Sequence, residues 1–300
     1  MSSERKFWIS GVNIVTHPHS PERYVKLLRL LLAQGHHVPV RGVQHLMIGE
    51  LRSLHSNNPV RGLQGRLYRF IHIDKDAGWF NIKRNDVATE QELEAVSFPD
   101  HLRPNTETYD FVFYPHGHTL YINTRSSMAV HGRYSTLSVG QVVKFLKVLC
   151  SLPEVTREFG DVEITALPDR EQFERILALP KLRHLVIEVV KPNPEQLSEA
   201  ETEVFSRLSK MKTRKIKQEL IAEKHESIVV DSETRTLAQV GAANGQVIGY
   251  GHAMDGQPVR ASTVDKPWRD QVAYNPEVQT EVDALHAATS TLPGHDTTPR

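Results

Sequence analysis

The alternation of helix and strand patterns between residues 109 and 190 constrains the fold of this chain most. Tyr109–Thr124 is typical of a β-hairpin, because two apolar segments flank the turn at residues 115–118. The segments that follow alternate in type: a helix from Ser138, a strand over Asp161–Leu167, a helix from Asp169 and a strand over His184–Val190. This order predicts an α+β fold in which helices cover a mixed sheet.

Residues 1–130 are expected to form a β-rich subdomain with one amphipathic helix. Phe7–Val15 carries the bulky and branched residues of a strand. After it, Ser20 is a predicted N-cap, Pro21 suits the first helical position and Gly35 suits the end of the helix. The helix should therefore cover a sheet built from the strands around it.

Residues 131–275 are expected to form a second, α/β subdomain that contains a long basic helix. Ser198 and Glu201 have the spacing of a capping box, and the helix is predicted to run to about Glu223. From 276 to 300 the chain is polar and lacks periodicity, which predicts a disordered tail.

The composition is that of a soluble globular protein, with 39% hydrophobic residues and a formal net charge of zero. Cys150 is the only cysteine, so no disulfide can form within the chain, which suits a reducing compartment. No apolar run approaches the roughly 20 residues of a membrane helix, and the polar N-terminus does not resemble a secretory signal. We therefore expect a cytoplasmic protein without membrane contact.

The charges are segregated along the chain. Between Arg23 and Ile73, eight basic residues face one acid, Glu50, and Arg207–Lys217 holds six basic residues and no acid. Local positive faces of this kind suit a polyanion such as nucleic acid, with DNA favoured over RNA. A solvated polar face is the simpler interpretation of either block.

The second block offers the best candidate contacts. On a helix, the spacing of Lys210, Arg214 and Lys217 places them on one face. Arg66 and Arg69 form a second set, on a strand that carries aromatic residues on one face. The predicted nucleic-acid-binding residues are Arg207, Lys210, Lys212, Arg214, Lys215, Lys217, Arg66 and Arg69.

Two alternatives remain open. A metal-dependent nuclease could use Asp161, Glu163 and Glu188, although the three-residue step from Glu188 to Lys191 requires a β-bulge to bring both side chains to one site. A protein-docking module could instead place the basic helix on an acidic partner.

Cofactor and metal signatures are absent from the sequence. The chain lacks a P-loop, a dinucleotide fingerprint and a Gly-x-Ser-x-Gly elbow. There are sixteen histidines, but none has a spacing typical of zinc ligands. We therefore predict no cofactor and no metal.

Several segments together resemble a bacterial family known only as a domain of unknown function, up to about residue 275. They are Gly65–Asp74, Trp79–Asn81, Pro99–Asn105, Phe111–Phe113, Val186–Asn193 and Ala242–Val247. In layout the chain is also similar to the Rex exclusion A protein of lambdoid phages and the B subunit of the Kiwa anti-phage system. This resemblance implies DNA binding by a sensor or adaptor of phage defence, with a partner protein from the same system or a homodimer as further possibilities.

Overall fold

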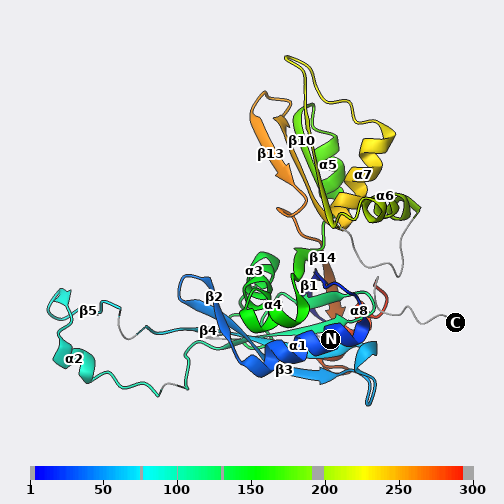
Figure 1. Cartoon of the computed structure of the whole chain (residues 1–300). Coiled ribbons are helices and arrows are strands. Elements are labelled where there is room, and N and C mark those ends of the chain that lie inside the picture. Colours follow the sequence, from blue (N-terminus) through cyan, green and yellow to red (C-terminus); the bar gives the residue numbers. More distant parts are fainter. Residues whose placement is uncertain (1–3, 75–76, 100, 130–131, 191–198, 293–300) are drawn as a thin grey trace.

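The computed structural model describes residues 4–74, 77–99, 101–129, 132–190 and 199–292. Helices and two main antiparallel sheets give the predicted α+β class (Figure 1). The larger sheet contains the N-terminal strands. The smaller sheet, with its own helices, forms a separate lobe over residues 170–190 and 199–262, and we call this part the small lobe.

The large sheet has the order β14-β1-β8-β7-β4-β3-β2, with β9 also paired to β1. Its strands are β1 (Arg5–Val15), β2 (His37–Arg41), β3 (Gln44–Ser53), β4 (Leu63–Ile71), β7 (Glu107–Tyr114), β8 (Thr119–Asn123), β9 (Glu163–Ala166) and β14 (Arg269–Tyr274). A short 3-10 helix, η1 (Pro59–Arg61), precedes β4. The pairing of β7 with β8 confirms the predicted hairpin.

Three helices cover one face of this sheet: α1 (Pro21–Gln34), α3 (Val139–Cys150) and α4 (Pro153–Phe159). The predicted caps of α1 are confirmed, since Ser20 accepts a hydrogen bond from the Arg23 amide and Gly35 adopts the left-handed conformation. Tyr24 and Phe145 are fully buried between these helices and the strands. α3 and α4 thus pack on the large sheet although they follow residue 131, and the division of the chain near residue 130 into independent subdomains remains a prediction.

The opposite face of the large sheet is partly covered by α8 (Glu281–Thr289). Thr280 and Asp283 form a capping box at its start, and Leu285 is buried among aromatic side chains of β1, β7 and β8. The predicted disorder from residue 276 is therefore wrong for this helix, because its apolar residues have a sheet to pack on. Residues 293–300 lie outside the described part of the chain.

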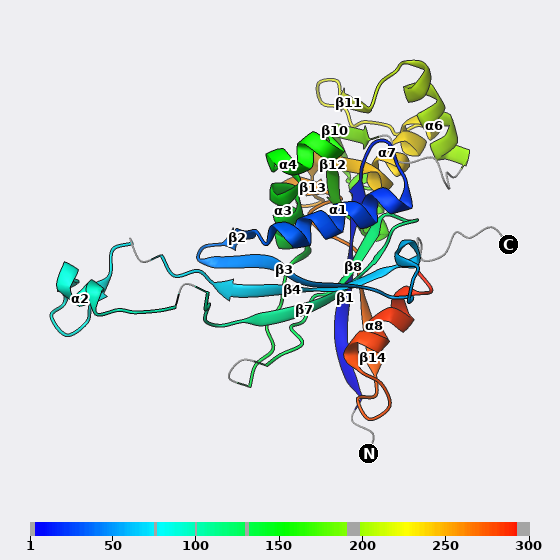
Figure 2. The ribbon, with the colours of Figure 1, turned by 60° about the horizontal axis from the view of Figure 1, so that its bottom comes forward.

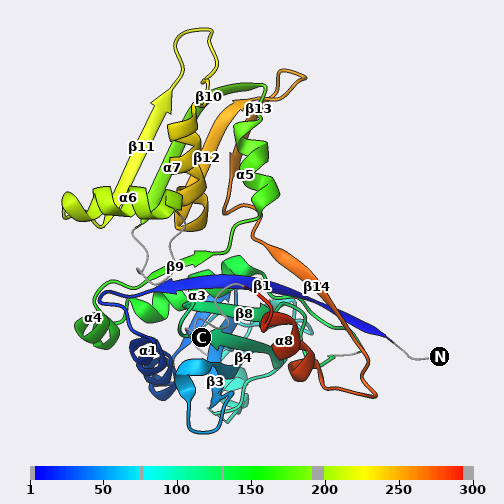
Figure 3. The ribbon, with the colours of Figure 1, turned by 90° about the vertical axis from the view of Figure 1, so that its right-hand side faces the viewer.

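The small lobe contains a four-stranded sheet of order β11-β10-β12-β13. Its strands are β10 (Lys181–Val190), β11 (Lys215–Ile221), β12 (Gly245–His252) and β13 (Pro258–Ser262). All three pairings are antiparallel, so the predicted mixed sheet is wrong in this detail. α5 (Arg170–Leu177), α6 (Glu199–Lys210) and α7 (Ser232–Ala243) lie on one face of the sheet (Figure 3).

The predicted helix to Glu223 is wrong beyond Lys210. The helix stops because Lys212 takes a left-handed conformation, with φ of 53°, and the Thr213 amide donates back to the Leu208 carbonyl at 2.9 Å. The chain then continues as the edge strand β11. Ser198, the predicted cap, lies outside the described residues.

Between β4 and β7 the chain leaves the sheet as a long arm (Figure 2). The arm carries β5 (Phe80–Asn81), β6 (Asp86–Val87) and α2 (Glu90–Glu94). The helix α2 begins with a capping box at Thr89. None of the helices in the described residues combines the length and apolarity needed to cross a bilayer.

Candidate functional site

The predicted basic segment is divided between a helix end, a turn and a strand. Arg207 and Lys210 lie in the last turn of α6, while Lys217 lies on β11. Because the backbone changes from helix to strand at the turn, the helical spacing from Lys210 to Lys217 does not place these residues on a common face. The predicted face of Lys210, Arg214 and Lys217 is therefore wrong, although all three residues are exposed.

Two cations of this segment form ion pairs with the acidic residues of the predicted nuclease site. Arg214 binds Asp161 at 2.9 Å and Glu163 at 2.5 Å, which joins the start of β11 to the β9 region of the large sheet. Hydrogen bonds to Glu163, and then to Asp161, raise the pKa of the Arg214 guanidinium. Lys215 binds Glu188 at 2.6 Å. A metal would have to displace these cations to use the carboxylates.

The predicted nuclease geometry also requires a bulge near Glu188. The irregularity that β10 does contain lies between Leu182 and His184. Glu188 is in regular register, opposite Lys217 on one side and Gln246 on the other. Lys191 lies outside the described residues.

The remaining cations form what we call the α6 patch: Arg207, Lys210 and Lys212. All three side chains are exposed. In the described part of the chain, none of them takes part in an ion pair. Within the described residues, the α6 patch can therefore meet an anion without first breaking an ion pair.

The α6 patch leads onto β11, which borders the second face of the small sheet. Leu185, Ile187 and Val189 of β10 point to the helices, so the alternating side chains of His184 and Glu188 point to the opposite face. None of the described helices packs on that face. It carries polar and charged residues and an aromatic pair, with Val186 and Val190 buried between them on β10.

The aromatic pair is His184 and Tyr250, on neighbouring strands. Their rings stack at 17° with centroids 5.0 Å apart. Arg260 lies opposite Tyr250 on β13, and Ile221 lies opposite His184 on β11. The free side of this ring stack is suited to contact with another flat group.

Arg66 and Arg69 lie on opposite faces of β4, and each is paired with an acid of β7. Arg66 Nε binds Asp110 at 2.7 Å, and Arg69 Nε binds Glu107 at 2.5 Å. Arg69 also donates to the Thr136 carbonyl, at 3.0 Å. Both arginines thus bind within the sheet, which leaves them less suited to phosphate contact than the sequence predicts.

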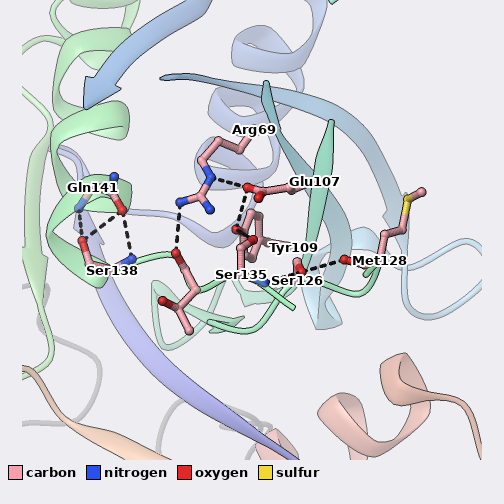
Figure 4. Close-up of polar contacts among 9 residues, drawn as sticks. Arg69, Glu107, Tyr109, Ser126, Met128, Ser135, Ser138 and Gln141 are labelled. Carbon is pink, nitrogen blue, oxygen red and sulfur yellow. Dashed lines mark hydrogen bonds and ion pairs between the residues drawn. The ribbon is translucent and has the colours of Figure 1, made fainter. Parts of the chain in front are cut away.

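Arg69 and Tyr109 are buried, and they form a hydrogen-bonded network with the half-buried Glu107 and Ser135 (Figure 4). Tyr109 donates to Glu107 and also bonds to Ser135 at 2.8 Å. Burial alone would raise the pKa of Glu107, but hydrogen bonds from Arg69 and Ser135 hold it below its ordinary value. Glu107 therefore carries a negative charge that needs Arg69 beside it.

A polar hollow of about 270 Å³ lies against this network. Its lining residues are Gln44, Arg69, Phe70, Ile71, Asn105, Glu107, Arg133, Tyr134 and Ser135. Two of its charged residues, Arg69 and Glu107, are already paired with each other, and we assign no ligand to the hollow.

The sequence missed a cluster of three histidines, His37, His45 and His72. One ring nitrogen from each lies within 4.8 Å of the others. Burial, followed by repulsion from neighbouring histidines and Arg103, lowers the pKa of His37 and lowers that of His45 to about 4. In the sequence, the only signal for this cluster is that its histidines lie at outward positions of strands. Their proximity depends on how the strands pair, which no local pattern contains.

The family of the chain follows from a match that covers nearly all of it. Residues 5–290 match the model of the family described as Domain of unknown function (DUF4747). The chain belongs to this family. A search of curated proteins finds no match. Since the description of the DUF4747 family names no activity or ligand, the chemistry has to be argued from the residues themselves.

Proposed function

We propose that this DUF4747 protein binds single-stranded nucleic acid on the small lobe, with phosphates at the α6 patch and a base on Tyr250. The observation that carries the proposal is the α6 patch itself, three exposed cations that no acid of the described chain neutralises. Such a group repels itself in the free protein. Phosphate would relieve this repulsion and release counterions.

The uncovered sheet face supports a single strand in particular. Antiparallel sheets of this kind bind unpaired bases by stacking them on aromatic rings, with cations along the backbone path. The stack of His184 and Tyr250 offers such a ring. From Lys215 to Ile221 the strand β11 spans about 20 Å, so a segment of a few nucleotides reaches from the α6 patch to Tyr250.

Two lysines of β11 lie close to glutamates, and this lowers the expected affinity for nucleic acid. Glu188 holds Lys215 at 2.6 Å, and Glu219 lies 4.0 Å from Lys217. These lysines therefore contribute less attraction than their number suggests. Binding should be weak, without base preference and sensitive to salt.

For the biological setting we propose a cytoplasmic sensor or adaptor of bacterial anti-phage defence. This is what the resemblance of the sequence to the Rex exclusion A protein and the Kiwa B subunit implies. A half-buried ring stack on a sheet face favours unpaired strands of DNA or RNA over duplex, which extends the DNA preference of the sequence prediction.

Charge reversal of the α6 patch tests the proposal. In fluorescence anisotropy with labelled single-stranded DNA and RNA, we expect the variant R207E/K210E/K212E to bind about tenfold or more weakly than the wild type. The matched control, R29E/R41E/K147E, reverses three exposed cations of the large-sheet part and should bind as the wild type does. Tyr250→Ala should also weaken binding by about fivefold or more, whereas Phe80→Ala on the arm should not.

The other hypotheses predict different results. Equal loss in the control variant would move the contact to the N-terminal basic block. Absence of binding at low salt would contradict the proposal and favour docking on an acidic protein. Magnesium-dependent cleavage of a plasmid that Glu188→Ala abolishes would favour the nuclease.

A further inference from the structure

The histidine cluster is built from three adjacent strands of the large sheet. His37 lies on β2, His45 on β3, and His72 directly follows β4. The register places them on one face, because His45 is opposite both Pro39 of β2 and Phe70 of β4, two residues from His37 and His72 respectively. The inward-facing neighbours Val38 and Leu46 belong to the core beneath the helices, so the histidines project from the outer face.

The three rings lie close together. Their centroids are separated by 4.7 to 5.2 Å, and the ring of Phe70 lies 5.7 Å from that of His37. His37 Nδ1 and His45 Nδ1 are only 2.8 Å apart. One of these two nitrogens must carry a proton and the other a lone pair.

His72 has the least satisfied ring. Its Nδ1 atom is buried and has no hydrogen-bond partner among the described residues. A buried polar nitrogen without a partner is unfavourable, so the ring would gain from a ligand. The cluster is therefore more than a set of packed aromatic side chains.

We propose that His37, His45 and His72 bind one divalent transition-metal ion, with Zn²⁺ the best fit. Zinc takes imidazole nitrogens at about 2.0–2.1 Å in a tetrahedron, which separates the ligand atoms by about 3.3 Å. One ring nitrogen from each histidine already lies within 4.8 Å of the other two, and His37 Nδ1 lies 2.8 Å from His45 Nδ1, so small side-chain rotations reach this geometry. His37 is exposed, which leaves the fourth position open to water or a substrate.

A bound ion would also change the mechanics of the sheet. β2 ends the described strand order and pairs with β3 alone. Zinc would join this edge strand to β3 and to the end of β4, where the arm leaves the sheet. Metal binding should therefore slow local opening of the edge and hold the base of the arm.

Zinc titration of the untagged, metal-free protein tests the site. We expect one Zn²⁺ per chain by calorimetry, and Co²⁺ in its place should give the visible absorption of a four-coordinate ion. His37→Ala and His45→Ala should each weaken binding by about 100-fold or more. The control His36→Ala changes the exposed histidine next to His37, outside the cluster, and should leave the affinity unchanged.

A second readout separates ligation from a folding defect. Because His37 is exposed, its replacement should leave the circular dichroism spectrum intact. Zinc should slow amide exchange in β2 and β3 of the wild type and not of this variant. Wild-type zinc affinity in His45→Ala, or a folded wild type that binds neither Zn²⁺ nor Co²⁺, would overturn the proposal. These results are independent of nucleic-acid binding, since the two sites share no residue.

Discussion

Replacing Arg69 with alanine is expected to lower the free energy of unfolding by about 3–5 kcal/mol. The Arg69 side chain is only 7% exposed. Its guanidinium is the cation beside Glu107, whose side chain is 15% exposed. Its removal leaves a carboxylate buried without a counter-charge. Burial would then raise the pKa of Glu107, and part of the cost would appear as proton uptake. Urea unfolding at pH 7, followed by circular dichroism, measures the change.

Arg52→Ala is the matched control for that prediction. Arg52 also binds a glutamate of the same sheet, Glu50 at 2.6 Å, but its side chain is 76% exposed. Exposed pairs contribute about 0–1 kcal/mol, so this variant should unfold almost as the wild type does. If Arg69→Ala instead kept wild-type stability and lost nucleic-acid binding, Arg69 would have the binding role that the sequence predicts and not the structural one.

Local signals in the sequence predicted the local structure well. Ser20 and Gly35 act within one turn of the helix end that each caps, so they specify α1 without reference to the rest of the chain. The hairpin of β7 and β8 is equally local. Elements of this kind can be read from spacing because their hydrogen bonds join residues close in sequence.

The segment after the turn at Lys212 forms a strand because its apolar residues have the period of a strand. On β11, Ile216 and Leu220 are half-buried whereas Lys215 and Lys217 are exposed, which is the alternation of a strand. The spacing of three and four residues between cations also fits a helix, but exposed cations do not determine the element. The apolar positions decide the element, since they must reach the core.

The sites depend on contacts that no local pattern contains. Arg214 meets Asp161 and Glu163 only because the turn before β11 lies beside the β9 region, some fifty residues earlier in the chain. His72 reaches His37 only through the order of β4, β3 and β2. Strand order and register therefore determine which charges are neutralised and which ligands converge.

The environment of His118 also depends on residues far from it in the sequence. It lies in the predicted turn after β7, where its ring packs against His19 and Tyr24 and is hydrogen-bonded to Asn13. Burial, aided by repulsion from His19, lowers the pKa of His118 to about 4. The ring is therefore neutral in the folded protein at every pH above about 5.

Acidification should destabilise the fold through His118. A histidine of the unfolded chain, with a pKa of about 6.5, binds a proton at pH values where His118 of the folded protein stays neutral. The free energy of unfolding therefore falls as the pH drops through 6.5 toward 4. We expect this group to remove about 2 kcal/mol between pH 7 and pH 5. His118→Asn suits the positive φ of 42° and cannot titrate. Urea unfolding at pH 7, 6 and 5 should thus show a shallower loss in the variant, with the other histidines contributing equally to both proteins. If both proteins instead lost stability with pH to the same extent, His118 would take up its proton while the protein stays folded. The turn that holds it would then open to water.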